Sequence, residues 1–187
     1  MIRALVGVAL LGVAGEALAA SFTLTDADTR AAIRTGERSI TSETFDREWR
    51  ISNGGGETAT VVTPFHRLAN AARHAAFKND PLKPADVARV LKEDANRLVM
   101  YVTLRGKGED FARFYVPCLV AGEREIKASF VQNERTAVRQ EDGAFMARCV
   151  YGFPIQDLTG RAKVTLVVAD ADGRDVSRFT IDLGTMR

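Results

Sequence analysis

The sequence predicts a mainly β protein of the α+β class, an antiparallel β-sandwich preceded by a short helical hairpin. Two observations predict this fold. Between residues 97 and 187, apolar side chains recur at every second position in several short runs, as in half-buried strands. Between residues 63 and 96, apolar residues instead recur at helical spacing after two helix starts marked by proline.

The alternating runs place one set of apolar residues on the inner face of each predicted strand. These positions are Leu98, Met100, Val102 and Leu104; Ala112, Phe114, Val116, Cys118 and Val120; Ile126, Ala128 and Phe130; Phe145, Ala147, Cys149, Tyr151 and Phe153; Val164, Leu166 and Val168; and Phe179, Ile181 and Leu183. Arg148 falls on the opposite face of its strand. We therefore expect six or seven short strands.

Turn residues separate these runs. The segments 106–108, 121–123, 141–143 and 172–173 all contain a glycine that can adopt positive φ. Short strands with turns between them, over ~90 residues, resemble an immunoglobulin-like domain in size and architecture. The sequence does not have the tryptophan of true immunoglobulin domains between its cysteines, because Trp49 lies upstream of both. The resemblance implies an immunoglobulin-like sandwich and carries no function.

Both cysteines lie in phase with the large apolar residues of their predicted strands. If these faces are the inner ones, the thiols of Cys118 and Cys149 point into one core, and a disulfide between them is expected. The alternative is two buried free cysteines that act as small apolar side chains.

The N-terminus is typical of a secretory signal peptide over residues 1–20. A basic start at residues 1–3 precedes an uncharged apolar run at residues 4–15, and Ala17–Ala19 supplies the small residues that precede a cleavage site. We expect cleavage near Ala19 or Ala20 and a periplasmic or secreted product.

Two features argue against a membrane anchor. The apolar run of the leader is too short for a stable transmembrane span. Ser21 also follows the small residues where a lipoprotein would carry cysteine, so the sequence has no thiol there to lipidate.

Residues 21–96 form the predicted N-terminal helical segment, which is packed on the sandwich domain at residues 97–187. Thr63 and Pro64 begin a helix that runs to about Lys78, and Pro84 begins a second one. Residues 26–38 are also helical in composition, and Gly36 is expected to end or weaken that helix. The segment holds few large apolar residues, so we expect it to pack on the sandwich rather than form its own core.

The motifs of common enzymes and metal sites are missing from the sequence. His66 and His74 are two helical turns apart, too far to share a metal ion, and we expect each at the surface or at an end of its helix. The glycines at residues 54–56 precede a predicted strand rather than a helix, so they do not form a phosphate loop. The acidic turn at residues 170–173 lacks the first and last ligands of a calcium loop. We predict no catalytic residue, metal ion or cofactor.

The remaining interpretation is an exported, non-enzymatic binding module whose partner is another envelope or secreted protein. A net charge of +2 is too small to indicate nucleic acid as the partner. The candidate binding residues are Arg113, Arg148 and Lys107, which lie in a turn or on the polar side of the strands. A hydrolase acting on an envelope polymer and a self-assembling structural subunit remain as alternatives.

Overall fold

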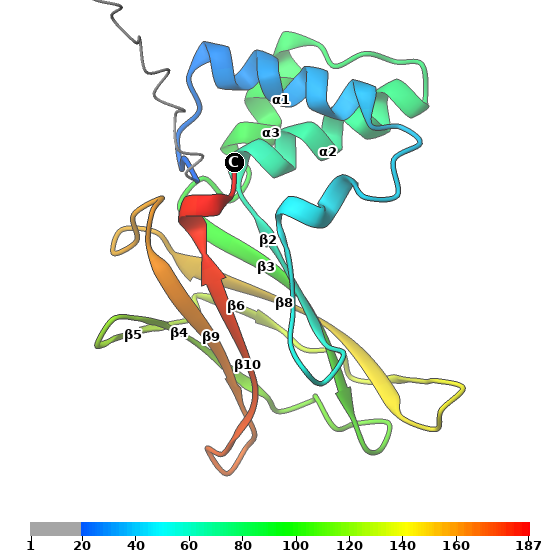
Figure 1. Cartoon of the computed structure of the whole chain (residues 1–187), viewed down its shortest axis with the longest axis vertical. Helices are drawn as coiled ribbons and strands as arrows, with labels where there is room; N and C mark the ends of the chain where they lie inside the picture. The colour runs from blue at the N-terminus through cyan, green and yellow to red at the C-terminus, as the bar shows by residue number, and fades with distance from the viewer. Residues whose placement is uncertain (1–19) are drawn as a thin grey trace, which may run out of the picture.

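The computed structural model describes residues 20–187 and has an α+β fold, with three α-helices at one end of two antiparallel sheets (Figure 1). Neither sheet closes on itself. The predicted signal peptide, apart from Ala20, lies outside the described residues. Within residues 20–187, no helix combines the length and apolarity needed to cross a membrane.

Sheet A has the strand order β1-β2-β3-β8-β6, and β7 also pairs with β8. Its strands are β1 (Arg50–Ser52), β2 (Thr58–Val62), β3 (Arg97–Gly106), β6 (Phe130–Gln132), β7 (Val138–Arg139) and β8 (Phe145–Pro154). The long strands β3 and β8 pair over their whole length, from Arg97 opposite Pro154 to Gly106 opposite Phe145. Strand β6 pairs with β8 and forms one edge of the sheet.

Sheet B has the strand order β10-β9-β4-β5. Its strands are β4 (Val116–Ala121), β5 (Arg124–Lys127), β9 (Lys163–Ala169) and β10 (Asp175–Asp182). The predicted turns are present, and their glycines at positions 108, 122, 143 and 173 all have positive φ. These turns therefore need glycine, because other residues adopt this conformation at a steric cost.

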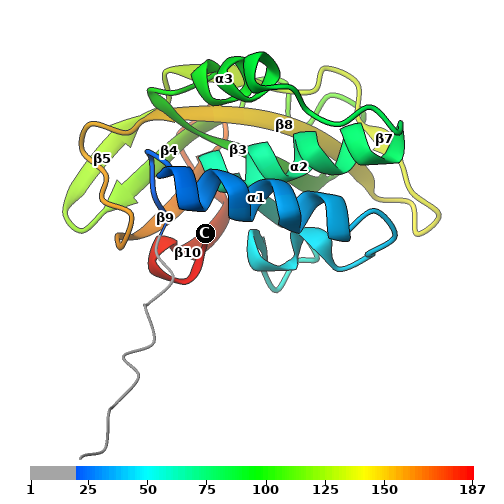
Figure 2. The same ribbon diagram turned by 90° about the horizontal axis from the view of Figure 1, so that it is seen from above.

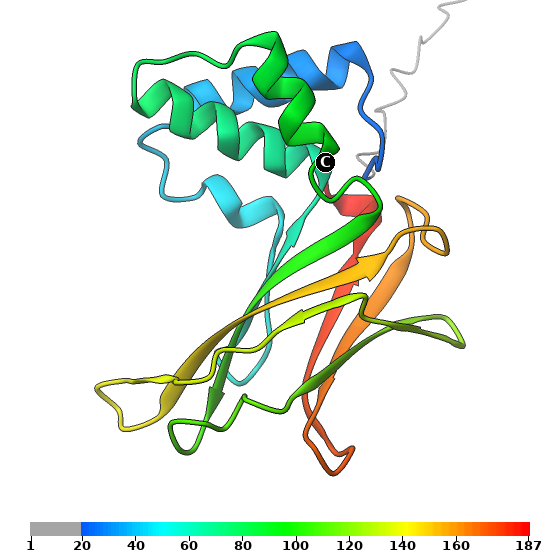
Figure 3. The same ribbon diagram turned by 180° about the vertical axis from the view of Figure 1, so that it is seen from behind.

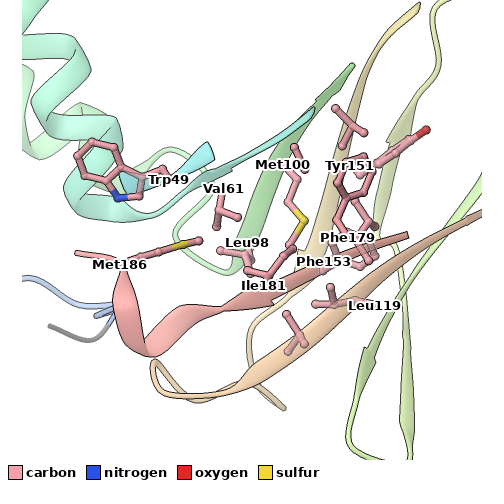
Figure 4. Packing of buried hydrophobic residues seen from close by; sticks show 14 of the residues in the cluster. Trp49, Val61, Leu98, Met100, Leu119, Tyr151, Phe153, Phe179, Ile181 and Met186 are labelled. Atoms are coloured by element: carbon pink, nitrogen blue, oxygen red, sulfur yellow. The ribbon is translucent and has the colours of Figure 1, made fainter. Parts of the chain in front are cut away.

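The inner faces of the two sheets share one hydrophobic core (Figure 4). Leu98, Met100 and Tyr151 from sheet A meet Leu119 and Phe179 from sheet B. The alternation predicted for β3, β8, β9 and β10 is confirmed, because the residues predicted to face inward on these strands are buried. The one exception among them is Phe145, at the start of β8, which is half-buried.

The predicted strand over residues 112–120 has the wrong phase. Residues 111–114 form a turn, the strand begins at Val116, and Pro117 and Leu119 are the residues that point inward. Phe114 and Val116, which were expected inside, are exposed. Since successive side chains alternate, Cys118 lies on the outer face of sheet B.

The predicted disulfide is consequently not formed, and both cysteines are free. Cys149 is buried on the inner side of β8, whereas Cys118 is half-buried on the far side of β4. The Cys118 thiol lies 3.8 Å from the backbone oxygen of Ile126 on the neighbouring strand. A disulfide would require β4 to turn over, which would expose Leu119.

The predicted run from Ile126 to Phe130 is also divided. Ile126 belongs to β5 in sheet B, and Phe130 begins β6 in sheet A. The chain therefore crosses from one sheet to the other at Ala128 and Ser129, on the side of the molecule seen in Figure 3.

The helices are α1 (Asp26–Arg38), α2 (Pro64–Phe77) and α3 (Pro84–Lys92), with α1 and α2 side by side (Figure 2). The helix predicted over residues 26–38 is present with these bounds, and Gly36 lies in its last turn without ending it. This glycine is buried where α1 crosses α2, and a Cβ atom built on it would lie 2.1 Å from the backbone oxygen of Ala69. Glycine is needed here because the two helix backbones approach closely.

An aromatic cluster joins the helices to the sheets, and His66, in the first turn of α2, belongs to this cluster and not to the surface. His66 is buried in α2, with its ring centroid 4.6 Å from that of Trp49 and 5.8 Å from that of Phe45. Phe45 begins the short 3₁₀ helix η1 (Phe45–Glu48), whose Asp46 Oδ1 lies 2.9 Å from His66 Nε2. His74 is exposed, as predicted.

A second short helix, η2 (Leu183–Thr185), leads to Arg187 beside this cluster. The Arg187 guanidinium donates to both carboxylate oxygens of Glu48, at 2.7–3.0 Å, and lies 4.8 Å from the centre of the Phe65 ring. The Trp49 indole N–H donates to the main-chain oxygen of Arg187 at 2.9 Å. These contacts tie the end of β10 to the base of α2.

Candidate binding site

The three predicted binding residues lie in different places. Arg113 is in the connection between β3 and β4, Lys107 is in the turn directly after β3, and Arg148 is on β8. Of the three, Arg113 lines a surface hollow of about 470 Å³. The structure therefore separates the predicted set.

The hollow has a volume of about 470 Å³ and opens beside β6. It is lined by Arg113, Phe114, Val131, Gln132, Asn133 and Arg135, and we call it the β6 hollow. One wall is the segment before β4 and the other is β6 with the residues after it. It therefore lies where the edge of sheet A meets the chain that enters sheet B.

Asn133 holds these two walls together. Its Nδ2 donates to the backbone oxygen of Tyr115 at 2.8 Å, and its Oδ1 accepts from the Tyr151 hydroxyl at 3.0 Å. Burial raises the pKa of the Tyr151 phenol far above its ordinary value, so the hydroxyl keeps its proton and remains a donor. One amide side chain thus links β8 of sheet A to the entry into β4 of sheet B.

The lining combines positive charge with exposed apolar surface. Arg113 and Arg135 form no ion pair within residues 20–187, whereas Arg105 and Arg124 pair with Asp142 and Asp157. The Phe114 side chain is 66% exposed, and the Arg113 guanidinium lies 5.3 Å from its ring centre. Val131 is 45% exposed. Charged groups without partners next to exposed apolar side chains are a common feature of binding surfaces.

Asn133 and Arg135 were not among the predicted binding residues, and Arg135 is the charged one of the two. It lies in irregular chain between β6 and β7, where neither periodicity nor a motif marks it. It meets Arg113 only because the chain crosses between the sheets before β6. No signal in the sequence pairs these two positions.

Arg148 belongs to a second polar surface, the outer face of sheet A. It lies opposite Thr103, and Tyr101 lies opposite Val150, so Arg148 and Tyr101 share this face. Tyr101 is 54% exposed. The backbone N–H of Arg148 donates to the Glu134 carboxylate at 2.5 Å, next to the β6 hollow. Arg148 therefore lies on a different surface from Arg113 and Arg135.

The most deeply buried carboxylate, that of Glu57, is occupied by structural hydrogen bonds. Its Oε2 accepts from the Ser177 hydroxyl at 2.5 Å and from Asn53 Nδ2 at 2.7 Å. Its Oε1 accepts from the backbone N–H of Arg105 at 2.9 Å. Glu57 therefore joins the turn between β1 and β2 to β10 and β3. Within residues 20–187, no group of three or more His, Cys, Asp or Glu side chains is placed to hold a metal ion.

Comparison with known proteins gives similar solved structures but no family. No family model matches the chain, and no curated protein matches it. Among solved structures, the chain is similar to a crystal structure described as a novel protein of unknown function from Burkholderia pseudomallei K96243. The two chains are 12% identical, with a TM-score of 0.44 over 87% of this chain and 95% of the other.

Proposed function

We propose that the protein is an exported, non-enzymatic binding module that holds another envelope or secreted protein at the β6 hollow. The observation that carries the proposal is the hollow itself, which is lined by two arginines without ion-pair partners in residues 20–187 and by the exposed Phe114 ring. An open hollow of this kind suits part of a protein partner better than an enclosed small molecule.

Export is supported by the leader pattern over residues 1–20. Ala20 is buried, and its N–H donates to the Leu183 backbone oxygen at 2.9 Å. Cleavage after Ala19 keeps Ala20 in this contact, whereas cleavage after Ala20 removes it. We therefore propose cleavage after Ala19, and N-terminal sequencing of the protein from the host envelope tests this.

The immunoglobulin-like character of the sandwich is part of the same proposal. The size of residues 97–187 and the two facing antiparallel sheets support it. It adds no argument about the partner, because this architecture serves many unrelated functions.

The binding proposal is tested by reversing charge in the hollow. Residues 20–187 are immobilised and exposed to envelope extract, and each bound protein is quantified by mass spectrometry. The wild type is compared with the Arg113→Glu/Arg135→Glu variant. A matched control reverses Arg30 and Arg34, two exposed positions on α1.

We expect at least one envelope protein to be recovered in equal amounts on the wild type and on the α1 control. Its recovery on the Arg113→Glu/Arg135→Glu variant should be at least about tenfold lower, since paired charges at an interface are worth about 1.5 kcal/mol or more. Equal recovery on all three proteins contradicts a role for the hollow.

A further inference from the structure

We infer that the partner presents an acidic, extended segment that adds to the free edge of β6 and places its carboxylates against Arg113 and Arg135. This inference rests on the proposed function and deepens it by naming the chemistry of the partner. It differs from other modes of binding at the same site because it requires main-chain pairing as well as charge.

The first argument is the state of β6. This strand pairs with β8 on one side only, and each of its three residues is exposed. Along the other side it presents main-chain N–H and C=O groups without a strand partner, which an added strand can bind. β6 pairs with Val150–Gly152, in the half of β8 that is nearer to the helices, but its residues remain exposed (Figures 1 and 3).

The second argument is charge complementarity. Arg113 and Arg135 lie on opposite walls of the hollow, and neither has an acidic partner within 4 Å in the described chain. Guanidinium groups bind carboxylates through paired hydrogen bonds. The side chains of an added strand alternate in direction, so acidic residues at alternate positions would all face the same side.

The third argument concerns the apolar lining. Phe114 and Val131 are exposed beside the two arginines, so the segment needs an apolar residue near its carboxylates. The partner segment is therefore short, extended, acidic and partly apolar. At ~3.3 Å per residue, β6 accommodates roughly three to five residues of it.

A second copy of this chain fits the site less well. In a two-fold pairing of β6 with β6, the added strand would again be Phe130, Val131 and Gln132, which carries no carboxylate to meet the two arginines. The charge of the hollow thus favours an acidic partner over self-association.

The experiment is an NMR titration of ¹⁵N-labelled protein, residues 20–187, with four peptides of eight residues, of three kinds. The first alternates aspartate with valine, the second alternates lysine with valine, and the third is the acidic peptide with every second amide N-methylated. The N-methylated peptide is made in both registers, because only one alternate set of amides faces β6. The charge-reversed proteins described above serve as variant and control.

We expect the acidic peptide to shift the amides of residues 130–135, with the lysine peptide binding at least tenfold more weakly. One N-methylated register should lose tenfold or more in affinity, and the other should stay within threefold. Arg113→Glu/Arg135→Glu should abolish binding, while the α1 control should bind as wild type does.

Three results would overturn the inference. The first is that the acidic peptide does not bind. The second is that both N-methylated peptides bind as tightly as the unmodified acidic peptide. The third is that light scattering shows a dimer of the wild type that is absent in the Arg113→Glu/Arg135→Glu variant. If one of these results occurs, but the Arg113→Glu/Arg135→Glu variant still fails to recover an envelope protein that the wild type binds, the inference fails and the proposed function stands. Equal recovery of envelope proteins on every variant removes both.

Discussion

The Tyr151 hydroxyl, on β8 of sheet A, donates to Oδ1 of Asn133 over 3.0 Å, and this bond positions one wall of the β6 hollow. The other end of the Asn133 amide donates to the Tyr115 backbone oxygen, on the chain entering sheet B. The shape of the hollow therefore depends on a buried phenol that belongs to the core. A change inside the core should alter the surface site.

Replacing Tyr151 with phenylalanine tests this dependence. The variant leaves Asn133 Oδ1 without its donor, and we expect a loss of about 1–2 kcal/mol in the free energy of unfolding, measured with urea. We also expect faster amide hydrogen exchange at residues 131–135. Tyr101→Phe is the control, since Tyr101 is exposed on sheet A, and it should stay within about 0.5 kcal/mol of wild type. Equal effects of the two substitutions would show that the bond does not hold the wall.

The close approach of α1 and α2 predicts a large effect of a single methyl group. In Gly36→Ala the new Cβ meets the backbone of Ala69, so α1 must move away from α2, at a cost of about 1–3 kcal/mol. Gly54→Ala is the matched control, because a Cβ there meets no atom within 4 Å. Thermal unfolding of both variants tests this expectation, and an unchanged or higher Tm for Gly36→Ala would contradict it.

The two cysteines should behave as independent thiols. In denaturant without reductant, alkylation should add two labels per chain, because Cys118 and Cys149 are both free. Burial raises the pKa of both thiols, and Cys149 is the more deeply buried. In the native protein Cys118 should therefore react at least about tenfold faster than Cys149. A chain that takes up no label in denaturant would show a disulfide.

His66 should make stability depend on pH. Burial lowers the pKa of its imidazole below the ordinary value of 6.5, although the hydrogen bond to Asp46 acts in the opposite direction. The unfolded chain therefore binds a proton near pH 6.5 and the folded chain binds it only at lower pH. The stability from this group is complete above pH 6.5 and falls as the pH decreases below that value.

Urea midpoints at pH 7.5 and pH 5.0 measure this effect. His66→Gln keeps a hydrogen-bond donor and removes the titration, so its stability should decrease less between the two pH values than that of wild type. His74→Gln removes an exposed histidine and should follow the wild type. If His66→Gln loses as much stability as wild type, His66 does not contribute to the acid sensitivity.

The strands with a clean apolar alternation were predictable from the sequence. The β3 and β8 patterns are confirmed because each strand has one face in the core over its whole length. The pattern before β4 failed because Ala112 and Phe114 belong to a turn, where alternation has no structural meaning. That error placed the Cys118 side chain on the wrong face of its strand and led to the prediction of a disulfide that is not formed.

The site could be predicted only in part. Arg113 was among the predicted residues because it falls on the polar side of the expected strand over residues 112–120, although it lies in the turn before β4. Arg135 and Asn133 were not, because their positions follow from the crossing between the sheets after Ile126, which is a tertiary feature. The close contact at Gly36 has the same origin, since it depends on the partner helix and not on α1 itself.

The claim that the β6 hollow holds a partner is tested most directly by site-specific photo-crosslinking in the host. A photoreactive phenylalanine analogue is placed at Phe114, which is 66% exposed in the hollow, or at Phe77, which is 73% exposed at the end of α2. We predict one crosslinked envelope protein at position 114 that is missing at position 77 and is lost when Arg113 and Arg135 are changed to glutamate. No adduct at position 114, or the same adducts at both positions, would contradict the account.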